Sequence, residues 1–190
     1  MAWLQPEIVT PTSAAWCSRE AAEIYLRTDS DDDEAPLLDG MIEAAGAQVE
    51  AITGLRLMPQ TVELKASSFA DLARLPIGPV RSVTSVEYRS QDGQVLPFDS
   101  AAWRKTGGSM EAGVAVMAGN SWPSVEPRED AIIVTVEVGY ESADAIPAPV
   151  RQACFLLLGD FYLHREDSGK PLSAIPNGVM ALLCNYRRFS

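Results

Sequence analysis

The sequence has little of what most catalytic and metal-binding sites are built from. It contains one histidine, His164, and three widely spaced cysteines, Cys17, Cys154 and Cys184. An odd number of cysteines at long spacings fits neither a disulfide framework nor a zinc site made from paired cysteines. We therefore expect reduced thiols, as is usual for proteins of the cytosol.

Long hydrophobic runs are also missing. No apolar stretch approaches the roughly 20 residues that cross a bilayer as a helix. The first residues, MAWLQPEIVTPTSAAW, lack the basic stretch and apolar core of a signal peptide. The expectation is a soluble intracellular protein with no membrane partner.

Positive charge is scarce. The chain has 15 Lys and Arg residues against 26 Asp and Glu, a formal net charge of −11. Affinity for nucleic acid comes mostly from Lys and Arg that displace counterions from phosphates, so this balance argues against a protein that grips DNA. It is compatible with a surface past which DNA slides, because like charges repel.

The acidic run 29–34 is a candidate calcium loop. Asp29, Asp31 and Asp33 have the alternate spacing of such a loop. However, Glu34 occupies the sixth position, which requires glycine, and Gly40 the twelfth, which requires glutamate. A solvated linker before a helix is the favoured interpretation.

The other candidate catalytic and binding residues also do not form a recognisable site. Cys154 lies ten residues before His164, which puts the two on different faces of a helix, so we interpret them as a core residue and a polar residue near a helix end. Gly107–Gly108 is interpreted as a loop rather than a phosphate cradle, and the adjacent Glu129 and Asp130 would point to opposite sides of a strand. The sequence therefore predicts no catalytic residue, cofactor or metal ligand.

What the sequence does have is enough apolar content, 47%, for one folded unit of 190 residues. Ser18 is a plausible N-cap for a short helix over 19–27. A second helix is predicted from Pro36, which suits a first turn, to a stop at Gly54. Its apolar positions recur at helical steps: Leu38, Met41, Ile42, Ala45, Val49 and Ile52.

The stretch 58–140 has a different texture, with short β-type segments separated by turn residues. Asp92–Gly93 suits a tight turn between two alternating segments and predicts a hairpin over 82–98. We expect a small antiparallel sheet whose strand order the sequence does not specify. We also expect a turn at Trp122–Pro123 and a last strand running toward Tyr140.

Helix returns after Pro147 and Pro149 and is predicted to continue to about Glu166. Its middle is apolar nearly all round, more than one core would bury, which suggests a second partner, either another helix layer or another subunit. The residues proposed for this subunit or scaffold packing are Phe155, Leu156, Leu157, Leu158, Phe161 and Tyr162. A last short helix begins near Val179, and the chain ends in the basic and aromatic sequence NYRRFS.

The order of these parts resembles a known family. A helix ending EAITGLRLMPQTVEL, a β stretch holding LPIGPVRSVTSVEYRSQDG, then SWP, AIIVTVEVGY, IPAPVRQACFLLLGDFYLHRE and IPNGVMALLCNYR are similar to the head–tail connector (adaptor) proteins of tailed bacteriophages. The resemblance covers about Ser18 to Arg187 and is to the larger members, which carry a β insertion. Arg19 departs from the pattern, since the family often has an apolar residue there.

The resemblance implies an α+β fold: a scaffold of about four helices, at 12–56 and 147–190, with an antiparallel β insertion at 57–140 between the second and third helices. It implies a non-enzymatic ring of about twelve copies in the neck of a virion, prophage particle or gene transfer agent, assembled in the bacterial cytoplasm. The partners implied are the portal protein above, the next connector or stopper protein below, and DNA passing through the centre without sequence-specific binding.

The resemblance also points to a docking segment, because adaptors of this family are thought to engage the portal through the end of the chain. The residues assigned to it are Tyr186, Arg187, Arg188 and Phe189. The β insertion and the acidic linker 29–34 are the first candidates for a surface facing the DNA.

Two alternatives stay open at this point. One is a small hydrolase that uses Cys154 or Cys184 as its nucleophile. The other is a nucleic-acid-binding assembly factor, against which the net charge already counts.

Overall fold

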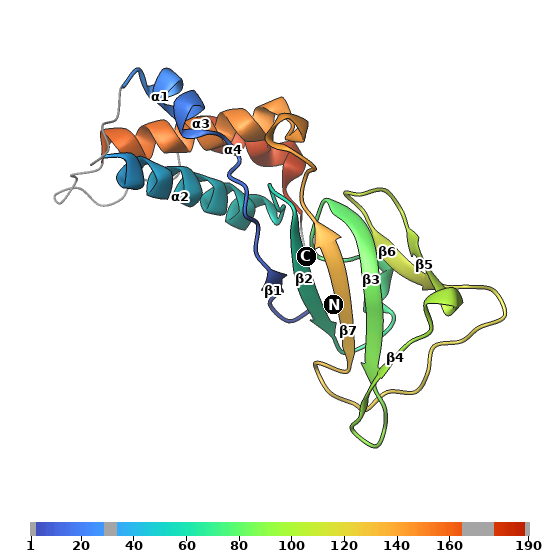
Figure 1. The fold of residues 1–190 in the computed structure, drawn as a ribbon. Coiled ribbons are helices and arrows are strands. Elements are labelled where there is room, and N and C mark those ends of the chain that lie inside the picture. Colours follow the sequence, from blue (N-terminus) through green and yellow to red (C-terminus); the bar gives the residue numbers. More distant parts are fainter. Residues whose placement is uncertain (1–2, 29–33, 165–176, 189–190) are drawn as a thin grey trace. The chain divides into compact units, whose positions relative to one another are not determined.

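The computed structural model describes residues 3–28, 34–164 and 177–188, and the chain divides into two compact units (Figure 1). The β unit comprises the residues up to Thr12 together with Pro59–Tyr140. The helical unit comprises Ser13–Met58 and Glu141–Phe189. The α+β class is confirmed, as is an antiparallel β region between the second and third helices.

Four α-helices and two short 3₁₀ turns make up the described part of the helical unit. They are α1 (Arg19–Leu26), α2 (Ala35–Thr53), η3 (Ala143–Ala145), α3 (Ala148–Leu163), α4 (Asn177–Leu183) and η4 (Cys184–Tyr186).

The helix starts and stops follow local chemistry. Ser18 is the N-cap of α1, and its side chain accepts a hydrogen bond from the Ala21 N–H at 3.2 Å, as predicted. Pro36 lies in the first turn of α2, and Gly54 ends that helix in the left-handed conformation with φ of 71°. The apolar stripe of α2 is also confirmed, with Leu38, Ile42, Ala45 and Val49 all buried.

The third helix is shorter than expected. The helix α3 ends at Leu163, and His164 is its C-cap, whereas the sequence predicted a helix to about Glu166. Helices α1, α2 and α4 all pack against α3. Its broad apolar surface is therefore covered largely by neighbouring helices of the same unit.

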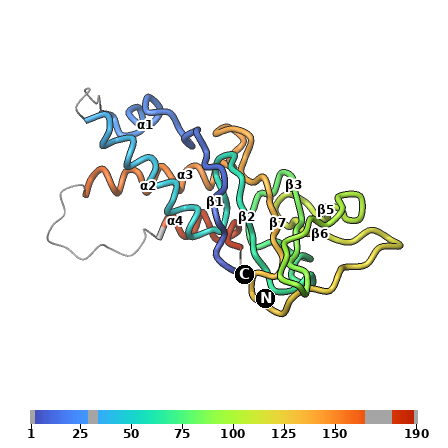
Figure 2. Tube along the Cα trace, turned by 60° about the horizontal axis from the view of Figure 1, so that its bottom comes forward, coloured from blue at the N-terminus to red at the C-terminus, as the bar shows by residue number. Residues whose placement is uncertain are grey.

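The β unit contains a five-stranded and a two-stranded sheet, both antiparallel. The strand order of the larger sheet is β1-β2-β7-β3-β4, so the last long strand lies at its centre. Strand β1 lies beside β2 in both ribbon and tube views (Figure 1; Figure 2). The elements are β1 (Glu7–Thr10), β2 (Gln60–Ala66), η1 (Asp71–Ala73), β3 (Val80–Arg89), β4 (Val95–Pro97), η2 (Ser100–Ala102), β5 (Trp103–Thr106), β6 (Gly113–Val116) and β7 (Ile132–Val138).

The core of this unit is built by alternation along the strands. In β2 every second residue is buried, and in the central strand β7 five of the seven residues are buried. The buried cluster comprises Val62, Leu64, Ala66, Leu72, Leu75, Ile77, Val80, Val86, Ala112, Val114, Ala131, Ile132, Val134, Val136 and Val138.

The predicted hairpin is confirmed. Strands β3 and β4 pair antiparallel, and Gly93 takes a positive φ of 79° in the turn between them. Gly107 is likewise in a loop, as interpreted, with φ of 70°.

Five sequence expectations about the β unit are corrected. The irregular start contains strand β1, and the strand β5 was not foreseen. No turn forms at Trp122–Pro123; Trp122 instead lies flat on Phe69, with ring centroids 4.4 Å apart and planes 7° apart.

Both ends of the last strand, β7, differ from the prediction. Strand β7 ends at Val138, since Gly139 turns the chain with φ of 99°. Glu129 and Asp130 precede the strand in a turn, so they do not point to opposite sides of it.

Candidate functional site

Of the two cysteines proposed as nucleophiles, Cys154 is buried, as is Cys17, whereas Cys184 is exposed. Burial raises the pKa of Cys17 to about 11. Burial, with the negative charges of Cys17 and Glu50, raises the pKa of Cys154 to about 12. Both side chains are therefore protonated at neutral pH, and the thiol is not the reactive form. Cys184 is exposed, and its thiol donates to the Ala181 carbonyl at 3.2 Å.

The His164 side chain contacts Asp160, one turn earlier in the chain, at the end of α3. Its Nδ1 lies 2.9 Å from the Asp160 carbonyl oxygen and 3.3 Å from the Asp160 carboxylate. Within residues 3–28, 34–164 and 177–188, no group of three or more His, Cys, Asp or Glu side chains could hold a metal ion. The candidate calcium ligands Asp29, Asp31 and Asp33 lie outside the described residues.

The docking segment at the end of the chain is anchored to the helical unit. Val179 and Leu183 of α4 are fully buried, and Tyr186 is half-buried. The Arg188 backbone N–H donates to the Thr53 carbonyl at the end of α2, over 2.9 Å. Arg187 is exposed between these two fixed points. Phe189 lies outside the described residues.

The end of α2, where this segment is held, is a closely bonded turn. The buried Thr53 hydroxyl donates to the Val49 carbonyl at 2.6 Å and accepts from the Leu55 N–H at 3.2 Å. The Glu50 carboxylate accepts from the Leu57 N–H at 2.7 Å and pairs with Arg56 at 3.2 Å.

Burial raises the pKa of Glu50, although the Leu57 N–H and the Arg56 guanidinium act in the opposite direction. Such a bonded carboxylate fixes the chain as it leaves α2. Sequence reasoning missed this turn, because none of its residues belongs to a recognisable motif beyond the terminal Gly54.

The six α3 residues proposed for packing divide into two groups. Leu157 and Leu158 are buried inside the helical unit, whereas Phe155, Leu156, Phe161 and Tyr162 are half-buried.

Two of the three aromatic members of that set, Phe155 and Tyr162, contact residues from the first part of the chain. The Phe155 ring lies 5.0 Å from that of Trp16 and 4.8 Å from that of Tyr25. The Tyr162 hydroxyl donates to the Thr28 hydroxyl at 3.0 Å.

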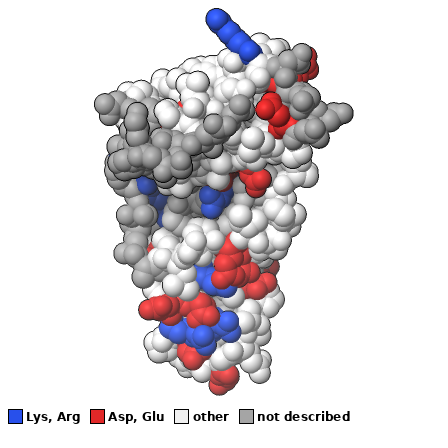
Figure 3. All heavy atoms as spheres, turned by 90° about the vertical axis from the view of Figure 1, so that its left-hand side faces the viewer, with Lys and Arg blue, Asp and Glu red and all other residues white. Residues whose placement is uncertain are grey.

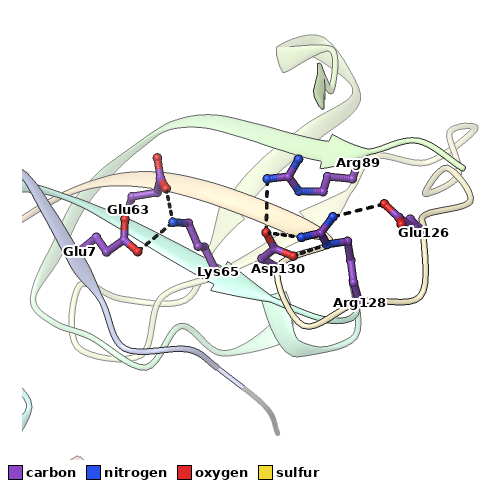
Figure 4. Close-up of polar contacts among 7 residues, drawn as sticks. All are labelled: Glu7, Glu63, Lys65, Arg89, Glu126, Arg128 and Asp130. Carbon is purple, nitrogen blue, oxygen red and sulfur yellow. Dashed lines mark hydrogen bonds and ion pairs between the residues drawn. The ribbon is translucent and has the colours of Figure 1, made fainter. Parts of the chain in front are cut away.

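Lys65, Arg89 and Arg128 of the β unit form ion pairs with carboxylates (Figure 4). The Lys65 ammonium lies 2.8 Å from Glu7 and 3.1 Å from Glu63, and the hydrogen bonds to these two residues raise its pKa. This ion pair also joins β1 to β2.

A second cluster lies before β7. Arg128 pairs with Asp130 and, at 3.6 Å, with Glu126, while Arg89 pairs with Asp130 at 3.2 Å. On the face drawn in Figure 3, acidic side chains are interspersed with basic ones, and no continuous basic band is visible among the described residues. The arrangement does not suit a grip on phosphates.

No helix among the described residues is long and apolar enough to cross a membrane. No protein-family model matches the chain, and no curated protein matches it.

Solved structures, in contrast, match over nearly the whole length. A chain in the neck of an empty gene transfer agent particle, computed with C6 symmetry, has a TM-score of 0.78 at 25% identity. A chain in the virion of a native gene transfer agent particle has a TM-score of 0.76 at 26% identity. A chain in the neck of a native particle, computed with C12 symmetry, has a TM-score of 0.69 at 24% identity.

Each likeness covers 98% of this chain and 97% of the other. The chain is thus similar, from one end to the other, to a protein in the neck of gene transfer agent particles, a likeness consistent with the head–tail connector family.

Proposed function

We propose that this chain is a structural head–tail connector, an adaptor in the neck of a gene transfer agent or related phage-like particle. The observation that carries the proposal is the likeness over 98% of this chain and 97% of the neck protein, at a TM-score of 0.78. A likeness of that extent takes in both units and all the connections between them, not only a common sheet or helix pair.

In this role the chain forms a ring of about twelve copies, centred on the axis along which DNA passes. Symmetric particles support the ring, because the similar chains come from necks computed with C6 and C12 symmetry. The net charge of −11 and the paired cations of the β unit support passage of DNA without sequence-specific binding. The ring joins the portal protein to the next connector of the tail.

The docking segment Tyr186–Phe189 is proposed to contact the portal. Arginine side chains form strong paired hydrogen bonds with carboxylates, and arginine and tyrosine are enriched among residues that dominate binding energy. The anchor of Arg188 at the end of α2 supports this role, because it gives the segment a defined starting point on the helical unit.

The test is electron cryo-microscopy of particles that carry this chain with an affinity tag. We expect multiple symmetry-related copies between the capsid and the tail, and particles without tails when the gene is deleted. A single copy per particle, or normal particles after deletion, would overturn the proposal. The hydrolase alternative predicts instead that Cys184→Ser abolishes function, which a connector does not require.

A further inference from the structure

The large exposed apolar side chains of the β unit gather on two strands. Ile8 and Val9 of β1 are 55% and 57% exposed, and Val95 and Leu96 of β4 are 42% and 36% exposed. Within the described part of the unit, the remaining large apolar side chain of this kind is Met117, which follows β6. Burying a side chain of this size from water is worth about 1.5–3 kcal/mol, so two such pairs at the surface are a liability in a free protein.

These two strands are the opposite edges of one sheet. The order β1-β2-β7-β3-β4 puts three strands between them, and in the described residues neither outer edge pairs with a further strand (Figure 1). A head-to-tail contact between identical copies requires two different surfaces on one subunit. The two edges of the sheet meet that requirement.

The β4 edge is backed by aromatic rings. Leu96 lies directly opposite Tyr88 in the β3–β4 register, so both side chains project from the same face. The Phe98 ring is 6.4 Å from that of Tyr88 and 5.0 Å from that of Trp122, which in turn stacks on Phe69. All four rings are half-buried. Such a rigid, partly exposed aromatic group is typical of the centre of a protein interface.

The β1 edge is narrow and well fixed. Ile8 pairs with Val62, and Glu7 is tied to β2 through Lys65. The register shift between Ile8 and Thr10 makes Val9 an extra residue in β1, so the strand does not alternate regularly here, and the exposed side chains of Ile8 and Val9 form a ridge along the edge. A ridge of two β-branched side chains can pack against the apolar surface beside β4.

Both edges are protected against simple strand addition. Pro97 lacks the N–H that an edge strand would donate, and a register shift between Ile8 and Thr10 interrupts β1, which Pro6 and Pro11 flank. A contact between the edges therefore consists of side-chain packing rather than a continuous hydrogen-bonded sheet. This protection also keeps free copies from adding to one another without limit.

We propose that, in the ring, the β1 edge of one copy packs through Ile8 and Val9 against Val95, Leu96 and the aromatic group beside β4 of the next copy. This inference rests on the proposed function, because the ring supplies the second copy. It assigns a role to residues 7–10, which lie outside the family resemblance in the sequence.

Crosslinking in assembled particles tests the contact. Particles carry Val9→Cys and Leu96→Cys together in a Cys184→Ser background, and a short bismaleimide joins thiols that lie close together. The remaining Cys17 and Cys154 are buried and stay unmodified. We expect a ladder of multiples of the chain's mass on a denaturing gel, and no ladder from either single-cysteine variant.

The outcomes separate the two proposals. If the double variant occurs in multiple copies in the neck but gives no ladder, the edge contact is wrong and the connector role stands. If Val9→Cys alone crosslinks to itself or to a protein of different mass, another partner covers β1 and the edge contact is again wrong. If the chain occurs as a single copy, the connector proposal itself fails.

A second measurement uses polar substitutions. Ile8→Ser with Val9→Ser should lower incorporation into particles at least about tenfold, while the circular dichroism spectrum of the free protein stays unchanged because both side chains are exposed. Met117→Ser is the matched control, because Met117 is exposed and apolar but belongs to neither edge strand. Equal incorporation of the double variant and the control would overturn the contact.

Discussion

The backbone N–H of Arg188 donates a hydrogen bond to the carbonyl oxygen of Thr53, so the end of the chain caps the end of α2. The last carbonyls of a helix have no partner within it, and this bond satisfies one of them. Arg188 Cβ also lies 3.5 Å from the place where a Cβ on Gly54 would be. The hydrogen bond to Thr53 uses the backbone N–H of Arg188, so it can be tested separately from any role of the guanidinium.

Two substitutions of Arg188 distinguish the cap from docking. Arg188→Pro removes the N–H, whereas Arg188→Ala keeps it, so the proline variant should have a free energy of unfolding about 1 kcal/mol lower than the alanine variant. Thermal unfolding of the free protein measures both. If docking uses the side chain, Arg188→Ala should nevertheless reduce attachment to portal-bearing heads. Normal attachment would remove Arg188 from the docking surface.

Truncation after Tyr186 should leave a folded protein that no longer joins heads to tails. It removes the 2.9 Å bond to Thr53 but leaves the buried Val179 and Leu183 in place, so the expected loss of stability is again about 1 kcal/mol. Particle yield and electron microscopy measure the function. Heads joined to tails at normal yield would show that the segment only ends the fold.

Two glycines of α2 should respond in opposite ways to alanine. A Cβ at Gly46 would lie 2.7 Å from Cδ1 of Trp16, a buried ring whose Nε1 donates to the Ile42 carbonyl. Gly46→Ala should therefore destabilise the protein by about 1–3 kcal/mol, in spite of the better helix propensity of alanine. At Gly40 nothing lies within 4 Å, so Gly40→Ala should stabilise by up to about 1 kcal/mol. Urea unfolding of the two variants compares them, and equal effects would contradict the packing described.

Thiol labelling should single out one cysteine. Cys184 is exposed, whereas burial raises the pKa of Cys17 to about 11 and that of Cys154 to about 12. A maleimide reagent at neutral pH should therefore add one label per native chain, and none to Cys184→Ser. Intact-protein mass spectrometry counts the labels. Rapid labelling of Cys154 in the folded protein would reopen the question of a nucleophile there.

Asp130 should contribute to the acid sensitivity of the β unit. Partial burial acts to raise its pKa, but the hydrogen bond and charge of Arg128 and the charge of Arg89 outweigh it and lower the pKa below the ordinary 3.8. A lowered folded pKa means that this stabilisation is fully present above about pH 4 and is lost as the pH falls through the folded value.

Asp130→Asn should accordingly lower the melting temperature at neutral pH, and the difference from the wild type should shrink below about pH 4. Glu129→Gln, at the neighbouring exposed position, is the control and should have little effect at either pH. A constant difference across the pH range would show that the Asp130 charge is not responsible.

Local signals in the sequence identified the helices and the hairpin. The cap at Ser18, the stop at Gly54 and the turn at Gly93 each act through a neighbour a few residues away, so the residues themselves specify the structure. Strand β1 depends on pairing with β2 more than 50 positions later in the chain, as in Glu7 opposite Glu63. The four residues of β1 lie between two prolines, and nothing in the local sequence predicts a strand there rather than irregular structure.

The candidate site was predictable to a similar extent. The proposal that the last residues dock to a partner stays a prediction, and the bond from Arg188 to Thr53 joins positions 135 residues apart and leaves no trace in the sequence pattern. Burial of Cys154 followed from its place on an apolar helix. The apolar edges of the sheet could not be recognised before the strand order was known, because Ile8 and Leu96 become comparable only as members of the two outermost strands.

Within the described residues the chain passes between the two units three times, near residues 12, 58 and 140. A protease that cuts at any one of these passages would leave the other two intact. After a cut near residue 12 or 58, pairing between β1 and β2 would hold the fragments together under native conditions, and after a cut near residue 140, packing of α3 against α1 and α2 would do so. The protein should therefore tolerate a single nick, since no one peptide bond is the sole connection between the two units.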